Sequence, residues 1–279
     1  MSAAADIAPA PAPARARRRT GRVTQLRVAR SEWTKLWSLR STRWSLLLAV
    51  IAMAGLGIVF GAVQMAHWSQ MSAQDRATFN PVDTSLGGWH IAQLAVGVLG
   101  VLVISGEYST GMIRSTFGAV PKRLPVLWAK AAVYCGVVFA LMLPSALIAF
   151  FASQAILKQH HVQTTIGAPH ILRAVVGCAL FLTVTGLLGL ALGSLVRNTA
   201  GGIATFAGVM FVLPGITAIL PNSWGDSIDP YLPLSAGTSI LAIHPDPSAL
   251  APWTGLLLFL GYAAAAMLIA ACLLVRRDA

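Results

Sequence analysis

The residues best suited to contact another molecule lie in one segment, from Gly106 to Arg123. It reads Gly-Glu-Tyr-Ser-Thr-Gly-Met-Ile-Arg-Ser-Thr-Phe-Gly-Ala-Val-Pro-Lys-Arg, and long apolar stretches flank it on both sides. Packing between apolar helices does not need this polar and cationic chemistry. We therefore expect the segment to interact with something outside the chain, through the residues Glu107, Tyr108, Gly111, Arg114, Pro121, Lys122 and Arg123.

Two interpretations of this segment are open from its residues alone. Gly111 and Gly118 bracket a stretch that can form a helical turn or two, and Pro121 ends it. A short helix held crosswise between two spans is suited to transmit motion, with its basic residues against acidic groups of a soluble partner. The alternative is a basic loop whose Lys and Arg only set the membrane topology.

No other pattern predicts a catalytic or metal site. The chain contains no Gly-Lys pair, so it cannot form a P-loop and hold ATP itself. It also lacks the zinc-hydrolase pattern H-E-x-x-H and the serine-hydrolase pattern G-x-S-x-G. We predict that the chain is not an enzyme and binds no cofactor or metal. His160-His161 is more readily explained as solvated loop sequence than as a metal ligand pair, and the cysteines, Cys135, Cys178 and Cys272, as apolar packing residues.

The composition predicts an all-α membrane protein. Of the 279 residues 56% are hydrophobic and 10% are charged, whereas a soluble domain carries about 25% charge. The isoelectric point near 10.6 is typical of nucleic-acid binding. However, ten of the 20 Lys and Arg precede the first apolar run and most others border apolar runs. This placement is typical of topology signals, so we expect no nucleic-acid partner.

Six apolar runs are long enough to span a bilayer, which takes about 20 residues. No run carries an Asp, Glu, Lys or Arg near its centre, which disfavours an ion-coupled carrier. The second run is short, the third is long, and Pro144 and Pro214 interrupt the third and the fifth. The expected spans are Trp44–Met65, Leu86–Ile104, Leu127–Leu157, Ile171–Val196, Gly201–Leu220 and Trp253–Val275.

Two segments precede the six-span domain, which we assign to residues 44–279. Residues 1–22 are rich in Ala, Pro and Arg and are predicted to be disordered. Residues 23–43 are predicted to form an interfacial connecting helix on the lipid membrane, with Trp33, Lys35, Trp37 and Arg40 at headgroup depth. Lys35 and Glu32 are three residues apart and can pair. The alternative is a polar extension of the first span.

The basic residues predict the orientation. With the N-terminus inside, 17 of the 20 Lys and Arg lie on the cytoplasmic side and three outside. An even number of spans returns the C-terminus to the cytoplasm, so we expect both termini of this multi-pass plasma-membrane protein there.

Three further features bear on packing. The pairs Gly57/Gly61 and Gly189/Gly193 predict close helix contacts, within the chain or in a dimer. Gln93 is expected to form an interhelical hydrogen bond or to contact substrate. The proline-rich outer segment 221–252 contains an apolar piece, 232–243, that can fold back as a broken helix.

Four motifs in order resemble those of ABC type-2 exporter permeases, especially actinobacterial ones. The resemblance covers roughly residues 26 to 275. The motifs are the segment 106–123, Glu32-Trp33-x-Lys35-Leu36-x-Ser38-Leu39-Arg40-Ser41-x-x-Trp44, Leu195-Val196-Arg197-Asn198-Thr199, and Tyr231-Leu232-Pro233-x-x-Ala236-Gly237.

This resemblance implies a permease subunit without ATPase activity of its own. Two such subunits would form the translocation path, as a homodimer or a heterodimer. Two separate ABC ATP-binding subunits would hold ATP and Mg. Residues 105–125 would match the coupling helix that receives the motion of the ATPase. Neither the substrate nor the residues that contact it are predicted, and the alternative function is a stand-alone secondary transporter or a membrane scaffold protein.

Overall fold

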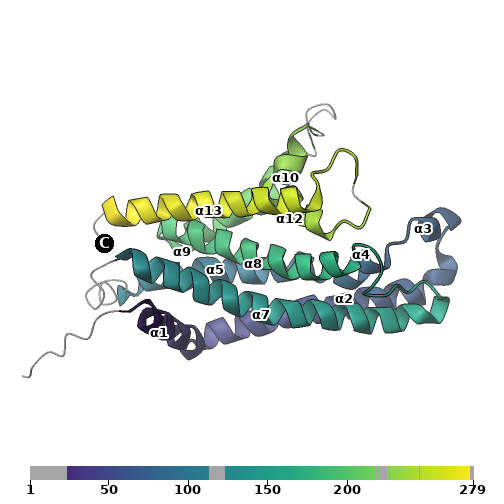
Figure 1. Cartoon of the computed structure of the whole chain (residues 1–279), viewed down its shortest axis with the longest axis horizontal. Coiled ribbons are helices and arrows are strands. Elements are labelled where there is room, and N and C mark those ends of the chain that lie inside the picture. The colour runs from purple at the N-terminus through teal and green to yellow at the C-terminus, as the bar shows by residue number, and fades with distance from the viewer. Residues whose placement is uncertain are drawn as a thin grey trace, which may run out of the picture.

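The chain folds into a helical bundle. The computed structural model describes residues 24–112, 123–217, 219, 225, 227–244 and 246–276, and this part of the chain contains helices and no strand. Helices α2, α5, α7, α8 and α13 run along the long axis, and α1 lies beside one end of the bundle (Figure 1). The all-α class expected from the composition is confirmed.

Six helical segments are long and apolar enough to cross a membrane, as predicted. They comprise α2 (Arg40–Ala66), α4 (Pro81–Leu86) with α5 (Trp89–Ser109), α7 (Arg123–Leu157), α8 (Ile171–Val196), α9 (Thr199–Ala207) with η3 (Gly208–Val212) and α10 (Leu213–Thr217), and α13 (Pro252–Arg276). The chain is therefore a multi-pass membrane protein.

Several spans begin a few residues before the predicted boundaries, and the second and fifth differ in a further way. The second is not short, since α4 and α5 together form a segment of 29 residues. It begins early because the Asn80 side chain caps α4, accepting hydrogen bonds from the backbone N–H groups of Val82 and Asp83, and Pro81 suits a first helical turn. The fifth span is divided by the π-helical turn η3, directly before the turn that contains Pro214.

Helix α8 lies at the centre of the bundle, and glycines in α8 and in α2 allow close contacts with neighbouring helices. A Cβ atom at Gly189 would lie 2.1 Å from the carbonyl oxygen of Gly97 in α5, and one at Gly57 would lie 2.2 Å from that of Ser85. Gly193 faces Val101, and Gly61 faces Ser153 of α7. Both glycine pairs therefore serve packing within the chain, which is the first of the two predicted uses.

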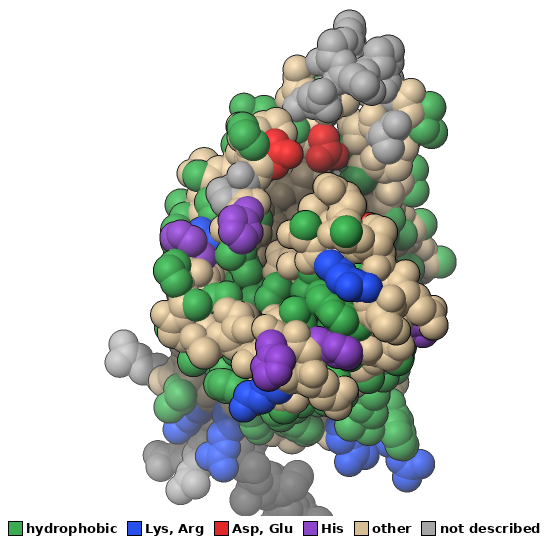
Figure 2. All heavy atoms as spheres, turned by 90° about the vertical axis from the view of Figure 1, so that its right-hand side faces the viewer, with side chains coloured by type: hydrophobic (Ala, Val, Ile, Leu, Met, Phe, Trp, Pro, Cys, Tyr) green, Lys and Arg blue, Asp and Glu red, His purple; other side chains and the backbone are tan. Residues whose placement is uncertain are grey.

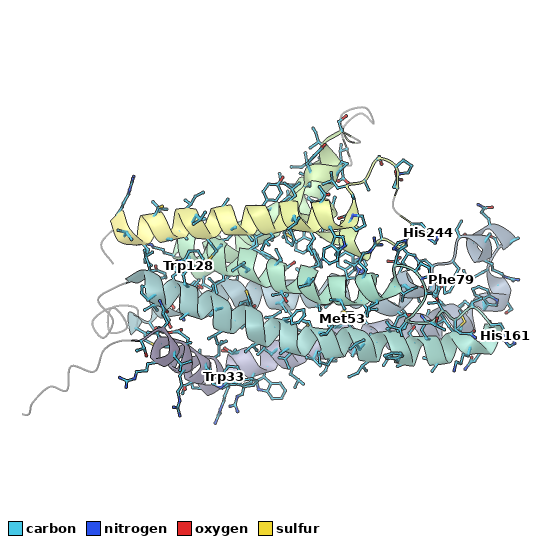
Figure 3. The ribbon with its side chains drawn as sticks, in the orientation of Figure 1. Trp33, Met53, Phe79, Trp128, His161 and His244 are labelled. Carbon is cyan, nitrogen blue, oxygen red and sulfur yellow. The ribbon has the colours of Figure 1, made fainter. Side chains whose placement is uncertain are left out.

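The bundle has two chemically different ends. At the α1 end lie α1 (Gln25–Ser38), the end of α5, the start of α7, the turn between α8 and α9, and the end of α13. The opposite end, the histidine end, carries His161 and His244 (Figure 3), and Figure 2 looks onto it and shows several histidine side chains. The six histidines lie at or near the ends of helices.

The predicted broken helix is present in the proline-rich segment 221–252. It consists of η4 (Asp229–Tyr231), α12 (Pro233–Thr238) and η5 (Ser239–Leu241), which pack against α13 and α8. Ala236 and Ile240 are fully buried, and the Arg173 guanidinium donates a hydrogen bond to the carbonyl of Ala242. Protein therefore covers this irregular backbone, as a segment near a membrane requires.

Candidate functional site

Helix α1 packs across the helices that lead into and out of the 106–123 segment. Its buried face is formed by Val28, Glu32 and Leu36, which repeat every four residues. Val28 packs with Val126 and Ala129 near the start of α7. The glutamate in this otherwise apolar stripe needs a partner, because burying a lone charge is costly.

Four charged side chains from three helices meet at this position, and we call them the ion cluster: Glu32 and Lys35 of α1, Glu107 of α5 and Lys130 of α7. The Lys35 ammonium donates to Glu32 Oε1 at 2.7 Å and to Glu107 Oε1 at 3.0 Å. The Lys130 ammonium donates to Glu107 Oε1 at 2.9 Å and to Glu32 Oε2. Lys35 of α1 thus joins α1 to α5, and Lys130 of α7 joins α7 to both α1 and α5.

The ion cluster is buried and electrically balanced. The side chains of Glu32 and Lys130 are each 3% exposed and that of Glu107 is 9% exposed. Two carboxylates face two ammonium groups, which reduces the cost of removing these charges from water. Removing one partner from such a buried pair typically costs about 3–5 kcal/mol, since a lone charge is left behind. The cluster therefore fixes the mutual positions of α1, α5 and α7.

Lys35 is the more exposed lysine and lies outside the spans. Burial lowers the pKa of Lys35, but the hydrogen bonds and negative charges of Glu32 and Glu107 outweigh this effect and raise it above its usual value. Its ammonium therefore stays charged at neutral pH and holds both carboxylates.

Tyr108 connects the end of α5 to the turn between α8 and α9. The Arg197 guanidinium lies 5.3 Å from the centre of the Tyr108 ring, which is a cation–π contact. Arg197 has a φ of 57° at the end of α8, and its side chain reaches the carbonyl of Leu273 in α13 at 3.4 Å. In the same turn, Thr199 donates to Ser105 Oγ at 3.0 Å. The motif Leu195–Thr199 thus joins α5, α8 and α13.

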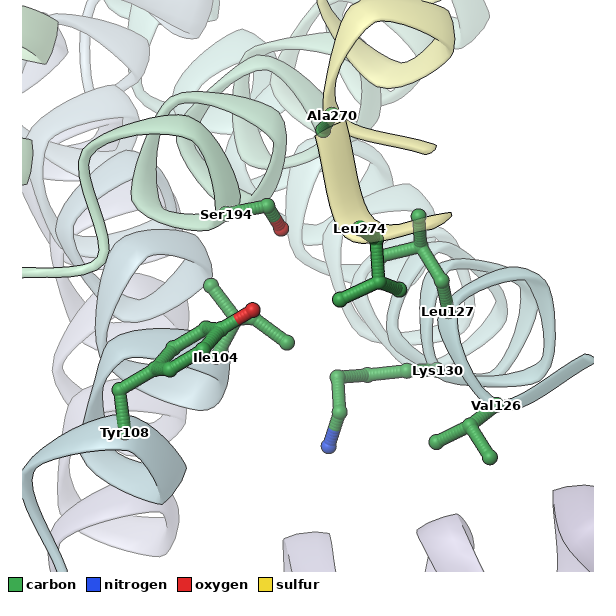
Figure 4. Close-up of a pocket in the computed structure, with 8 residues that line it drawn as sticks. All are labelled: Ile104, Tyr108, Val126, Leu127, Lys130, Ser194, Ala270 and Leu274. Carbon is green, nitrogen blue, oxygen red and sulfur yellow. The ribbon is translucent and has the colours of Figure 1, made fainter. Parts of the chain in front are cut away.

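A small cavity of about 10 Å³ lies between these helices and the ion cluster. Figure 4 shows Tyr108 and Ile104 of α5 on one side, and Lys130, Leu127 and Leu274 on the other. This volume corresponds to about one water molecule. The inner surfaces of α5, α7, α8 and α13 are therefore closely packed here.

Only part of the predicted contact segment can be placed. Gly111 follows α5 with a φ of 69°, a left-handed conformation that favours glycine. Arg123 begins α7. Arg114, Pro121 and Lys122 lie outside the described residues, as does the tail 1–22.

The structure gives Glu107 a different environment from the one its sequence position indicates. It does not extend from the end of a span towards a partner, but is buried against Lys130 and Lys35. The reason is that the predicted pair of Glu32 and Lys35 also contacts the other two helices. Lys35 binds Glu107 of α5, and Glu32 binds Lys130 of α7.

The residues predicted on the interfacial helix occupy two elements. Trp33 and Trp37 are exposed on α1, with ring centres 5.8 Å apart, and Lys35 joins the ion cluster. The helix ends at Ser38, Leu39 has an extended conformation, and Arg40 begins α2. Figure 3 shows Trp33 on α1 at one end of the bundle. The exposed indoles are suited to headgroup depth.

Sequence reasoning missed Lys130 and the long-range role of Glu32 as functional residues. Lys130 is one of the 17 basic residues that the sequence assigns to the cytoplasmic side, and Glu32 is expected there only to pair with Lys35. The available signal was a lone lysine inside the apolar run Leu-Trp-Ala-Lys-Ala-Ala. Such a residue needs a carboxylate from a neighbouring helix.

Two other candidates do not form a site. Gln93 donates to the carbonyl of His90 in its own helix at 3.3 Å, and in the described structure its Oε1 has no partner, so the expected interhelical bond is not seen. Within the described ranges, no three His, Cys, Asp or Glu side chains are placed to hold a metal ion.

Comparison with known proteins does not assign the chain to a family. No protein-family model matches its sequence, and none of the curated proteins is significantly similar to it.

Proposed function

We propose that this chain is the transmembrane permease subunit of an ATP-driven ABC exporter. In this proposal it forms the translocation path with a second permease subunit and is driven by a separate ATP-binding subunit in the cytoplasm. The α1 end then faces the cytoplasm, in keeping with the distribution of Lys and Arg.

The ion cluster is the observation that carries the proposal. Glu107 and Lys130 belong to the two helices that flank the segment 110–122, and Glu32 and Lys35 join both helices to α1. A force applied to this segment would therefore reach α1, α5 and α7 together. A subunit that is moved by an external ATPase needs such a rigid connection between its contact segment and its spans.

The chain's own chemistry supports an external energy source. It lacks the glycine-rich turn and lysine that hold nucleotide phosphates. Basic residues at 114, 122 and 123 are suited to an acidic surface on the ATPase. ATP and Mg would bind to that partner.

Affinity purification tests the proposal. The tagged chain should co-purify from its native membranes, in a mild detergent, with a P-loop ATPase in stoichiometric amount. The isolated chain should show no heat of binding when titrated with ATP and Mg. Micromolar ATP binding by the isolated chain would contradict the proposal, and so would purification of an intact complex without any ATPase. The second result would favour a stand-alone carrier or scaffold.

A further inference from the structure

The first two turns of α2 carry an open groove with a volume of about 470 Å³. Among the described residues, two arginines and two apolar side chains line it, and all four are exposed: Arg40, Arg43, Trp44 and Leu47. At 100° per residue these positions fall within an arc of about 100°, so they share one face of the helix. The buried residues in this part of α2, Thr42, Leu46 and Ala49, lie on the other side. The groove therefore opens away from the bundle.

The two arginines of the groove are free to bind an anion. Neither forms an ion pair with any described residue. The described carboxylates at this end of the bundle are Glu32 and Glu107, and the lysines of the ion cluster bind both. Positions three residues apart on a helix have Cβ atoms about 5–6 Å apart, so both guanidinium groups can reach one anion. A guanidinium binds a phosphate through two parallel N–H groups, and the pair is therefore suited to a phosphate.

The depth of the groove in the membrane indicates a lipid phosphate. The stretch 44–66 of α2 contains no charged residue, and at 1.5 Å per residue it is about 35 Å long. This length is close to the hydrocarbon thickness of about 30 Å. Arg40 and Arg43 directly precede the stretch and so lie at the level of the head groups. Trp44 is 68% exposed beside them, and exposed tryptophans are enriched at this level.

The same face of α2 continues as an exposed apolar stripe. Leu47 and Ile51 follow Trp44 at intervals of three and four residues, and both are exposed. An acyl chain attached to a phosphate at the arginines would lie along this stripe. A zwitterionic head group would bring its ammonium close to two guanidinium groups, and α2 contains no Asp or Glu that could pair with it. The charge of the groove therefore favours a lipid with a net negative head group.

We propose that this groove binds an anionic phospholipid, with its phosphodiester held by Arg40 and Arg43 and an acyl chain along Trp44, Leu47 and Ile51. The bound lipid would hold the junction between α1 and α2, where the helices are separated by a single extended residue. The inference does not depend on ATP-driven export.

Native mass spectrometry of the purified full-length chain in a mild detergent tests the proposal. Titration with dioleoylphosphatidylglycerol should show saturable binding of one high-affinity lipid per chain. Dioleoylphosphatidylcholine has the same acyl chains but a cationic group on its head, so it should bind at least tenfold more weakly. Equal affinities for the two lipids would overturn the proposal.

Two matched double variants locate the lipid. Arg40→Gln combined with Arg43→Gln removes both guanidinium groups and should weaken phosphatidylglycerol binding at least tenfold. Arg27→Gln combined with Arg30→Gln is the control, since it removes two exposed arginines with the same spacing from α1. Its affinity should stay within about twofold of the wild-type value, because exposed charges outside the site contribute little. An equal loss in both double variants would show attraction by overall charge and would overturn the site.

Two further measurements separate a lipid from a soluble phosphate compound. Glycerophosphoglycerol, the same head group without acyl chains, should not displace the bound lipid at millimolar concentration. Leu47→Gln should weaken lipid binding several-fold, whereas Leu257→Gln, at an exposed position of α13, should leave it unchanged. Displacement by glycerophosphoglycerol, or wild-type affinity in the Leu47→Gln variant, would overturn the assignment of the groove to a lipid.

Discussion

Glu107 accepts hydrogen bonds from two lysines on two different helices, and this arrangement decides its role. A carboxylate at the end of a span can bind a soluble partner protein, or it can form ion pairs within its own chain. Burial to 9% exposure and distances of 2.9 and 3.0 Å to Lys130 and Lys35 favour the second role. Glu107 therefore acts within the proposed transporter by connecting helices.

Removal of Lys130 should destabilise the protein strongly. Lys130→Ala leaves Glu32 and Glu107 with only the half-exposed Lys35, so the free energy of unfolding should fall by about 3–5 kcal/mol. Lys158→Ala is the control, because Lys158 is exposed at the histidine end and should change stability by less than about 0.5 kcal/mol. Denaturant titration of the detergent-purified variants measures both. Equal stability of the two variants would contradict the proposed role of the ion cluster.

Local patterns in the sequence predicted only part of this cluster. The pairing of Glu32 with Lys35 follows from helical spacing and is confirmed at 2.7 Å. The bond between Glu32 and Lys130 joins residues 98 positions apart, and helical periodicity contains no information on such a distance. It depends on how α1 crosses α7, which only the folded structure shows.

At the scale of elements, glycine sets the distance between α5 and α8. These two helices make the most extensive contact in the bundle, and Gly189 and Gly97 lie directly against each other. Membrane helices gain little from apolar burial against one another, so close van der Waals contact between backbones becomes important.

Gly189→Ala should therefore loosen the centre of the bundle. Its Cβ would lie 2.1 Å from the Gly97 carbonyl oxygen, and overpacking of this kind typically costs about 1–3 kcal/mol. Gly261→Ala in α13 is the matched control, since its Cβ meets nothing within 4 Å. Thermal unfolding should show a lower midpoint for the first variant and an unchanged or higher one for the second. Identical midpoints would show that α8 can shift at no cost.

Element type was more predictable than element boundaries. Runs of about 20 apolar residues predict spanning helices reliably, because a bilayer leaves few alternatives for the backbone. The extension of the second span to Pro81 depends on the Asn80 cap, and the division of the fifth depends on a π-helical turn. Both are local backbone features that hydropathy does not report.

For the whole molecule, the basic residues predict that the α1 end faces the cytoplasm. Ser31→Cys on α1 and Gln74→Cys at the histidine end are both at exposed positions. In intact cells, a membrane-impermeant maleimide should label Gln74→Cys, and it should label Ser31→Cys only after permeabilisation. A tag at either terminus should likewise be reached only after permeabilisation. The reverse pattern would invert the proposed orientation and place the 106–123 segment away from any cytoplasmic ATPase.

ATP hydrolysis by the reconstituted complex tests the central claim most directly. The chain and its co-purified ATPase would be placed in nanodiscs, with Arg114→Glu compared against Arg76→Glu at the histidine end. The first variant replaces attraction to an acidic partner surface by repulsion, so its hydrolysis rate should fall several-fold. The second should hydrolyse ATP at the wild-type rate. A wild-type rate for Arg114→Glu, with the ATPase still bound, would contradict the assignment of this chain as the coupled permease.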